Sequence, residues 1–156
     1  ATGAEALLSC YLVLLAEAYH KAGNTVAGLD ALTSAMEHVN KTEERWYEAE
    51  LYRLQGELLL IQERKSQKSA PSNPHSQIPA SYSEAEACFQ KAIEIARRQQ
   101  AKSLELRATV SLARLWQRQG KQHAARNTLS EIYGWFTEGF DTKDLQEAKA
   151  LLEELR

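Results

Sequence analysis

The sequence predicts an all-α repeat protein in which pairs of helices follow one another along the chain. Apolar residues recur at helical spacing through most of the 156 residues, a pattern of small and large residues occurs three times, and the prolines all fall within residues 71–79. Because stacked helix pairs bury one continuous core, we expect a single domain over 1–156, an α-solenoid of about three repeats followed by a C-terminal helix.

The repeat is visible as pairs of small and large side chains at fixed spacing. Each expected second helix carries a small residue and, four positions later, a large one: Gly28 and Leu32, Ala85 and Phe89, and Ala125 and Leu129. Each expected first helix has a small residue of its own: Ala16, Gly56 and Ala113. Small residues let two helix backbones approach closely. Since glycine costs about 1 kcal/mol relative to alanine inside a helix, we expect Gly56→Ala to be stabilising.

The second repeat contains an insertion. The two small residues of a repeat are 12 positions apart in repeats one and three but 29 apart in repeat two. The difference of 17 matches the serine- and proline-rich stretch at 66–82, whose composition buries little, so we expect that stretch to be dispensable. Without it the period is 40 residues. The expected elements are repeats at 4–40, 43–100 and 102–137 and a terminal helix at 142–155.

Helix ends are marked by capping residues. Asn24 is expected to cap the helix that follows it, and Ser83 with Glu86 matches a capping box for a helix beginning at 83. Gly23 and Gly120 fall in the turns inside repeats one and three.

Composition and motifs argue against catalysis. The net charge of −2 gives no general attraction to nucleic acid or anionic membranes, and no apolar stretch approaches the length of a membrane span. The sequence has no phosphate-binding glycine motif and no HExxH, and its two cysteines lie far apart. We therefore expect no enzyme activity, cofactor, metal, nucleic-acid partner or membrane partner, and a reducing, cytoplasmic location.

The first helices are expected to line a concave groove that binds a partner. The candidate polar residues of that groove are Glu17, His20, Glu50, Arg53, Glu57, Arg107, Arg114 and Gln117. The same helix faces carry Cys10, Val13, Leu60 and Val110. Acidic residues prevail in the first two repeats and basic residues in the third, which predicts a groove with oppositely charged ends. The alternative is that these are surface charges paired within single helices. If the groove binds its partner, reversing both Arg107 and Arg114 to Glu should slow association and leave the fold intact, because exposed charges contribute little to stability.

The small-and-large patterns resemble the tetratricopeptide repeat, whose signature is Gly-x2-Tyr in the first helix and Ala-x3-Phe in the second. Three longer segments are more specific: "ERWYEAELYRLQGELLL" (44–60), "EAEACFQKAIEIARRQQAKSLELRATVSLARLWQRQGK" (84–121) and "YGWFTEGFDTKDLQEAKALLEEL" (133–155). They are similar to the C-terminal tetratricopeptide region of large bacterial signalling proteins. In those proteins a class III adenylate/guanylate cyclase or transcription-regulator domain precedes an AAA-like or STAND-type ATPase. The resemblance implies a piece of a longer protein with a sensor or scaffold role, and it assigns no catalytic residue.

Three functions remain open from the sequence. The first is an interaction module that binds a protein, a peptide or other domains of its parent chain. The second is a sensor in which a small molecule fills the groove and alters the curvature of the repeats. The third is an architectural spacer that binds nothing.

Overall fold

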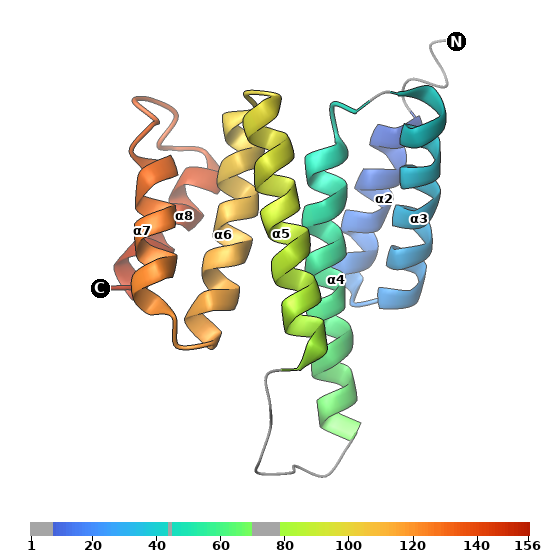
Figure 1. Cartoon of the computed structure of the whole chain (residues 1–156), viewed down its shortest axis with the longest axis horizontal. Helices are drawn as coiled ribbons and strands as arrows, with labels where there is room; N and C mark the ends of the chain where they lie inside the picture. Colours follow the sequence, from blue (N-terminus) through green and yellow to red (C-terminus); the bar gives the residue numbers. More distant parts are fainter. Residues whose placement is uncertain (1–7, 44, 70–78) are drawn as a thin grey trace.

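The protein is all-α in the residues that the computed structural model describes, which are 8–43, 45–69 and 79–156. These ranges hold seven helices and no strand (Figure 1). The helices are α2 (Leu8–Ala22), α3 (Thr25–Thr42), α4 (Glu48–Ser69), α5 (Ala80–Arg98), α6 (Lys102–Arg118), α7 (Gln122–Tyr133) and α8 (Lys143–Glu154). The expected order of seven helices is confirmed. None of the described helices is both long and apolar enough to cross a membrane.

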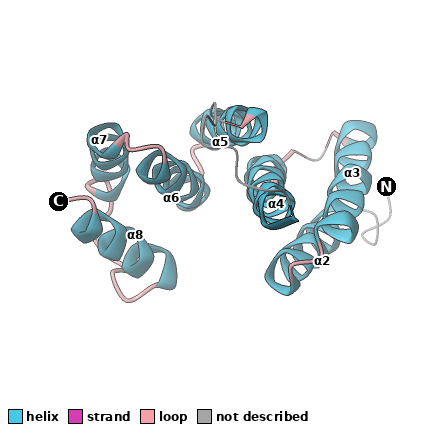
Figure 2. Cartoon of the chain, turned by 90° about the horizontal axis from the view of Figure 1, so that it is seen from below, coloured by secondary structure: helices cyan, strands magenta, loops and turns pink. Residues whose placement is uncertain are grey.

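Each helix packs against the next one along the chain, so that the helices form the pairs α2–α3, α4–α5 and α6–α7, followed by α8. The first helices also contact one another, α2 with α4, α4 with α6, and α6 with α8. Within the described ranges, α3, α5 and α7 make no such contacts with each other. The stack therefore curves into an arch, with α2, α4, α6 and α8 on its inner side (Figure 2).

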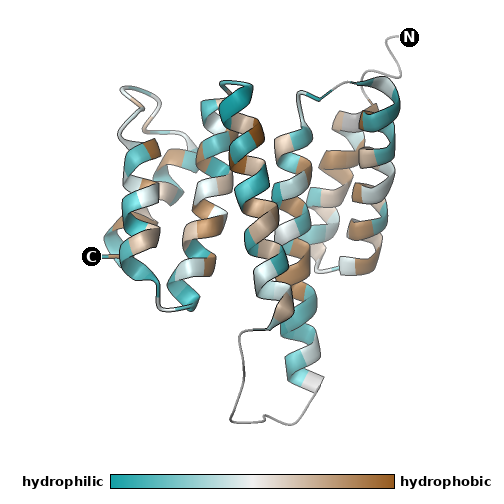
Figure 3. Ribbon diagram, in the orientation of Figure 1, coloured by the Kyte–Doolittle hydropathy of each residue, from teal (hydrophilic) through white to brown (hydrophobic). Residues whose placement is uncertain are grey.

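The core lies between paired helices, where hydrophobic residues recur along each ribbon (Figure 3). Ala16 packs in one cluster with Leu32, and Ala113 in another with Leu129. At Gly56 the partner is the larger, fully buried Phe89. A Cβ atom on Gly56 would lie 2.5 Å from Phe89 Cε1, so the expectation that alanine stabilises this position is wrong.

Two of the three expected helix-end features are confirmed. Gly23 and Gly120 adopt φ of +69° and +76°, a region that glycine enters without strain. The Asn24 side chain accepts a hydrogen bond from the Ala27 N–H at 3.3 Å. The capping box is wrong, because α5 begins three residues before Ser83, directly after Pro79.

The insertion joins two helices that pack against each other, as expected, but its boundaries differ. Helix α4 continues through 66–69 and α5 already includes 80–82, while 70–78 lie outside the described residues. Ser81 Oγ donates a hydrogen bond to Glu63 at 2.8 Å, and Tyr82 packs against the cluster that contains Phe89. The expectation that the whole of 66–82 is dispensable is therefore wrong for Tyr82.

Helix α2 carries exposed apolar side chains at positions that are buried in α4. Tyr11 is 62% exposed, whereas Leu51, the corresponding residue of α4, is 1% exposed because α3 covers it. Leu14 is exposed and its counterpart Leu54 is buried in the same way. Among the described residues, no helix packs against α2 in the way that α3 packs against α4.

Candidate interaction groove

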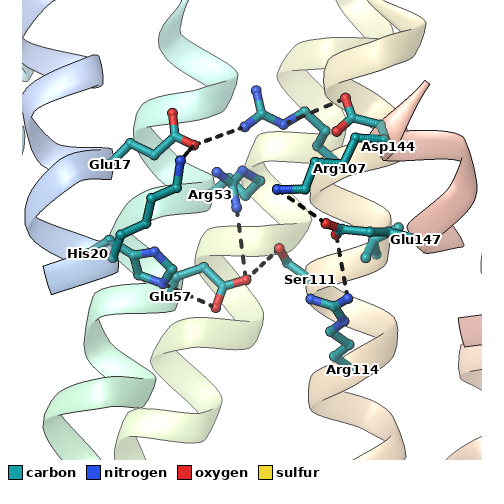
Figure 4. A pocket seen from close by; sticks show the side chains of 12 residues that line it. Glu17, His20, Arg53, Glu57, Arg107, Ser111, Arg114, Asp144 and Glu147 are labelled. Atoms are coloured by element: carbon teal, nitrogen blue, oxygen red, sulfur yellow. Dashed lines mark hydrogen bonds and ion pairs between the residues drawn. The ribbon is translucent and has the colours of Figure 1, made fainter. Parts of the chain in front are cut away.

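A hollow of about 220 Å³ lies on the inner side of the arch, and we call it the inner groove (Figure 4). All four inner helices contribute to its wall. The lining residues are Glu17, His20 and Lys21 of α2, Arg53 and Glu57 of α4, Arg107, Val110, Ser111 and Arg114 of α6, and Lys143, Asp144 and Glu147 of α8. Because each inner helix presents residues three, four or seven positions apart, one face of each helix is turned toward the groove.

The floor of the groove rests on one buried carboxylate, Glu50, which is 2% exposed. Arg53 donates to it in bidentate fashion, from Nη2 to Oε1 at 2.6 Å and from Nε to Oε2 at 2.9 Å. Arg107 Nη2 of α6 lies 3.0 Å from the same Oε1. We call Arg53, Glu50 and Arg107 the Glu50 clamp. The two guanidinium groups compensate for the desolvation of the buried carboxylate. Because one comes from α4 and the other from α6, they also fix these two helices against each other.

The Glu50 clamp extends to the two ends of the arch through Arg107. Its guanidinium lies 3.9 Å from Glu17 of α2 and 3.9 Å from Asp144 of α8. Burial alone would raise the pKa of Glu17, but the hydrogen bond and charge of Lys21, with the charges of Arg107 and Arg53, lower it overall. Arg107 therefore contacts carboxylates of three other inner helices.

The pKa of Arg53 is also shifted in favour of the charged form. Burial would lower the pKa of its guanidinium, but the hydrogen bonds and charge of Glu50, with the charges of Glu57 and Glu17, raise it overall. The Glu50–Arg53 pair lies within one helix, as the surface-charge alternative expected, but it is buried and shared with α6. The premise that Arg107 is an exposed charge is wrong, and reversing it would place a third carboxylate beside Glu50 and Glu17.

A second set of contacts lies along the groove below the Glu50 clamp. Ser111 Oγ of α6 donates to Glu57 Oε1 of α4 at 2.6 Å, and His20 Nε2 of α2 lies 3.9 Å from Glu57 Oε2. On the other side, Glu147 of α8 pairs with Arg114 at 3.5 Å and with Lys143 at 3.7 Å. Carboxylates and basic groups thus alternate around the wall, and Figure 4 shows them pointing toward one another.

Most of the candidate residues meet at this site. Six line the inner groove: Glu17, His20, Arg53, Glu57, Arg107 and Arg114. Glu50 lies beneath it, and Gln117 lies outside the lining and donates to Glu154 at 3.4 Å. Of the apolar candidates Val110 lines the groove, while Val13 and Leu60 are buried in the core.

The sequence missed the contribution of α8, because groove residues are expected only from the first helix of each of the three repeats. Lys143, Asp144 and Glu147 share one face of that helix at spacings of one, three and four, a signal that could have added them. The expected separation of charge into an acidic and a basic end is wrong. The basic residues of α6 face carboxylates of α2, α4 and α8, so the two signs are interleaved.

The described residues contain no group of three or more histidine, cysteine, aspartate or glutamate side chains that could hold a metal ion. Comparison of the chain with models of known protein families, with curated proteins and with solved structures finds no match.

Proposed function

We propose that this chain is a non-catalytic interaction module, a tetratricopeptide-like solenoid of about three repeats whose inner groove binds a peptide or a segment of another protein domain. One observation carries the proposal: the inner groove runs across all four inner helices and offers carboxylates and basic groups in alternation. A surface of this kind suits a partner with an ordered pattern of charges, since each partner charge can find an opposite one.

The division of the groove into a floor and a rim supports this role. Glu50 is shielded from water, and the Glu50 clamp joins α4 to α6. Lys21, Arg114 and Lys143 have exposed side chains, and their ion pairs are the kind that solvent screens strongly. The rim can therefore exchange its internal partners for those of a bound chain while the floor stays unchanged.

The resemblance to the repeat region of bacterial cyclase- and ATPase-containing signalling proteins suggests where such a module would act. In that setting the partner is another domain of the parent chain or a separate signalling protein, and the location is cytoplasmic.

A small-molecule sensor is the alternative, and the cavity supports it less. Pockets for drug-sized ligands are typically about 300–1,000 Å³ and mostly apolar. The inner groove measures about 220 Å³, and nine of its twelve lining residues are lysine, arginine, aspartate or glutamate. An architectural spacer that binds nothing would have no use for such a groove.

Selection of random peptides on the immobilised chain tests the proposal. We expect selected peptides to carry both acidic and basic residues and to lose at least tenfold in affinity for Arg114→Glu, which reverses a rim charge without touching the Glu50 clamp. Arg126→Glu is the matched control, since Arg126 is an exposed arginine of α7 away from the groove. Selected peptides that bind the Arg114→Glu variant as tightly as the unchanged chain would reject the groove as the binding site.

A further inference from the structure

The Glu50 clamp has a counterpart three helical turns further along the same two helices. Arg64 follows Arg53 by 11 residues on α4, and Arg118 follows Arg107 by 11 residues on α6. Eleven residues make about three turns of an α-helix, or about 16 Å, so each later arginine lies on the same face as the earlier one.

The register between α4 and α6 places these later arginines at the same level of the two helices. The two helices run parallel and contact each other (Figure 1). Two cross-links fix their register, the hydrogen bond from Ser111 to Glu57 and the pairing of Arg53 and Arg107 through Glu50. In both cases the α6 residue number exceeds the α4 number by 54, and the same offset joins Arg64 to Arg118. We call Arg64 and Arg118 the open arginine pair.

The open arginine pair lacks the carboxylate that completes the Glu50 clamp. Glu50 stands three residues before Arg53, and the residue three before Arg64 is Ile61. Neither Arg64 nor Arg118 makes a hydrogen bond or an ion pair with any described residue, although both side chains are exposed and other arginines of the inner helices are paired.

The electrostatics agree with an uncompensated site. Partial burial lowers the pKa of Arg118, the positive charges of Arg64 and Arg114 lower it further, and Glu57 and Tyr82 oppose them without restoring it. Glu57 is already engaged by Ser111, Arg53 and His20. Two guanidinium groups thus lie near enough to repel each other, and no carboxylate of the described residues pairs with either of them.

We propose that the open arginine pair binds an oxyanion, a carboxylate or a phosphoryl group, in the place that Glu50 fills in the clamp. Arginine suits this task because its planar fork of N–H donors matches both groups. The inference rests on the proposed function in one respect: the anion belongs to the partner that lies in the inner groove. It gives that partner an anionic group about three helical turns beyond the Glu50 clamp.

Titration of the whole chain with sodium phosphate and, separately, with sodium acetate at constant ionic strength tests the site. The readout is the NMR signal of each arginine Nε–Hε group. We expect saturable shifts at Arg64 and Arg118 with at least one anion. Saturation by phosphate alone assigns a phosphoryl group to the partner, and comparable saturation by acetate assigns a carboxylate.

Three variants make the result specific. Arg64→Gln should weaken binding at least tenfold, and Ile61→Glu should do the same because it supplies an internal carboxylate at the position equivalent to Glu50. Arg126→Gln, which removes an exposed arginine of α7, should bind like the unchanged chain. Absence of saturation with both anions, or equal binding by Ile61→Glu, would overturn the proposal. Because the probes are inorganic phosphate and acetate, such a failure leaves the peptide-selection result for the groove unaffected.

Discussion

Gly56 and Phe89 show how the repeats adjust single residues to one another. Where the first helix has alanine, at Ala16 and Ala113, the buried partner in the second helix is a leucine. Where it has glycine, the partner is the larger Phe89. The lost methyl group and the larger ring offset each other, so the volume between the helices is conserved.

A Gly56→Ala substitution should therefore destabilise the protein, by about 1–3 kcal/mol, because the added methyl group overlaps the ring of Phe89. The free energy of unfolding in urea measures this. In a Phe89→Leu background the same substitution should cost less, since alanine with leucine is the pairing of the other two repeats. Equal costs in the two backgrounds would show that the ring is not the obstacle.

Glu105 is a buried carboxylate that pairs with two basic side chains. Its carboxylate is 3% exposed and receives hydrogen bonds from Arg97 Nε and Lys102 Nζ, both at 2.7 Å. Burial would raise the pKa of Glu105, but these hydrogen bonds and the two charges lower it overall. Since the unfolded chain binds this proton more readily, the stabilisation is present above the unfolded pKa and lost as the pH falls through the folded pKa.

Glu105→Gln should cost about 1–3 kcal/mol at neutral pH, the scale of lost hydrogen bonds to charged groups. The cost should shrink on acidification, because the unchanged protein then loses the same stabilisation. Urea unfolding at a series of pH values from neutral to acid measures the difference between the two chains. A difference that stays constant down to full protonation would contradict the assignment. Glu131→Gln, at an exposed position of α7, is the control.

At the scale of elements, the sequence predicts helix order and partners well and some boundaries poorly. Helical spacing of apolar residues and the turns at Gly23 and Gly120 are local signals, and they located the helices. The capping-box match at Ser83 puts the start of α5 three residues too late, because the helix begins at Ala80, directly after Pro79. Tyr82 lies in this added turn and packs on the cluster that contains Phe89.

Tyr82→Ala should therefore destabilise the α4–α5 pair, by about 1–3 kcal/mol for a partly buried aromatic residue. Ser83→Ala, one position later and exposed, should change the unfolding free energy by less than about 0.5 kcal/mol. Thermal or urea unfolding distinguishes the two variants. A larger loss from Ser83→Ala than from Tyr82→Ala would restore the capping-box interpretation.

At the scale of the whole molecule, charges far apart in the sequence meet on the inner side of the arch. Arg107 contacts Glu17, Glu50 and Asp144, which come from three different helices. The repeat pattern identified the faces that carry most of these residues. It could not show which charges pair, because that depends on the curvature of the arch, and a helix-by-helix count instead gave two separate charged ends.

Arg107→Gln should destabilise the protein by about 1–3 kcal/mol, because buried Glu50 then keeps Arg53 and loses the second of the two cations that pair with it among the described residues. Arg114→Gln, at a neighbouring but exposed position, should stay within about 0.5 kcal/mol. Urea unfolding at low salt measures both. Equal small effects would mean that Arg107 is one more solvated surface charge.

The most direct measurement of the central claim is the footprint of a selected peptide on the chain, read from backbone amide shifts in NMR. If the inner groove is the binding surface, the perturbed amides should concentrate on α2, α4, α6 and α8, with their largest changes near Glu17, Glu57, Arg114 and Glu147. A footprint centred on α3, α5 and α7, the outer side of the arch, would contradict the account.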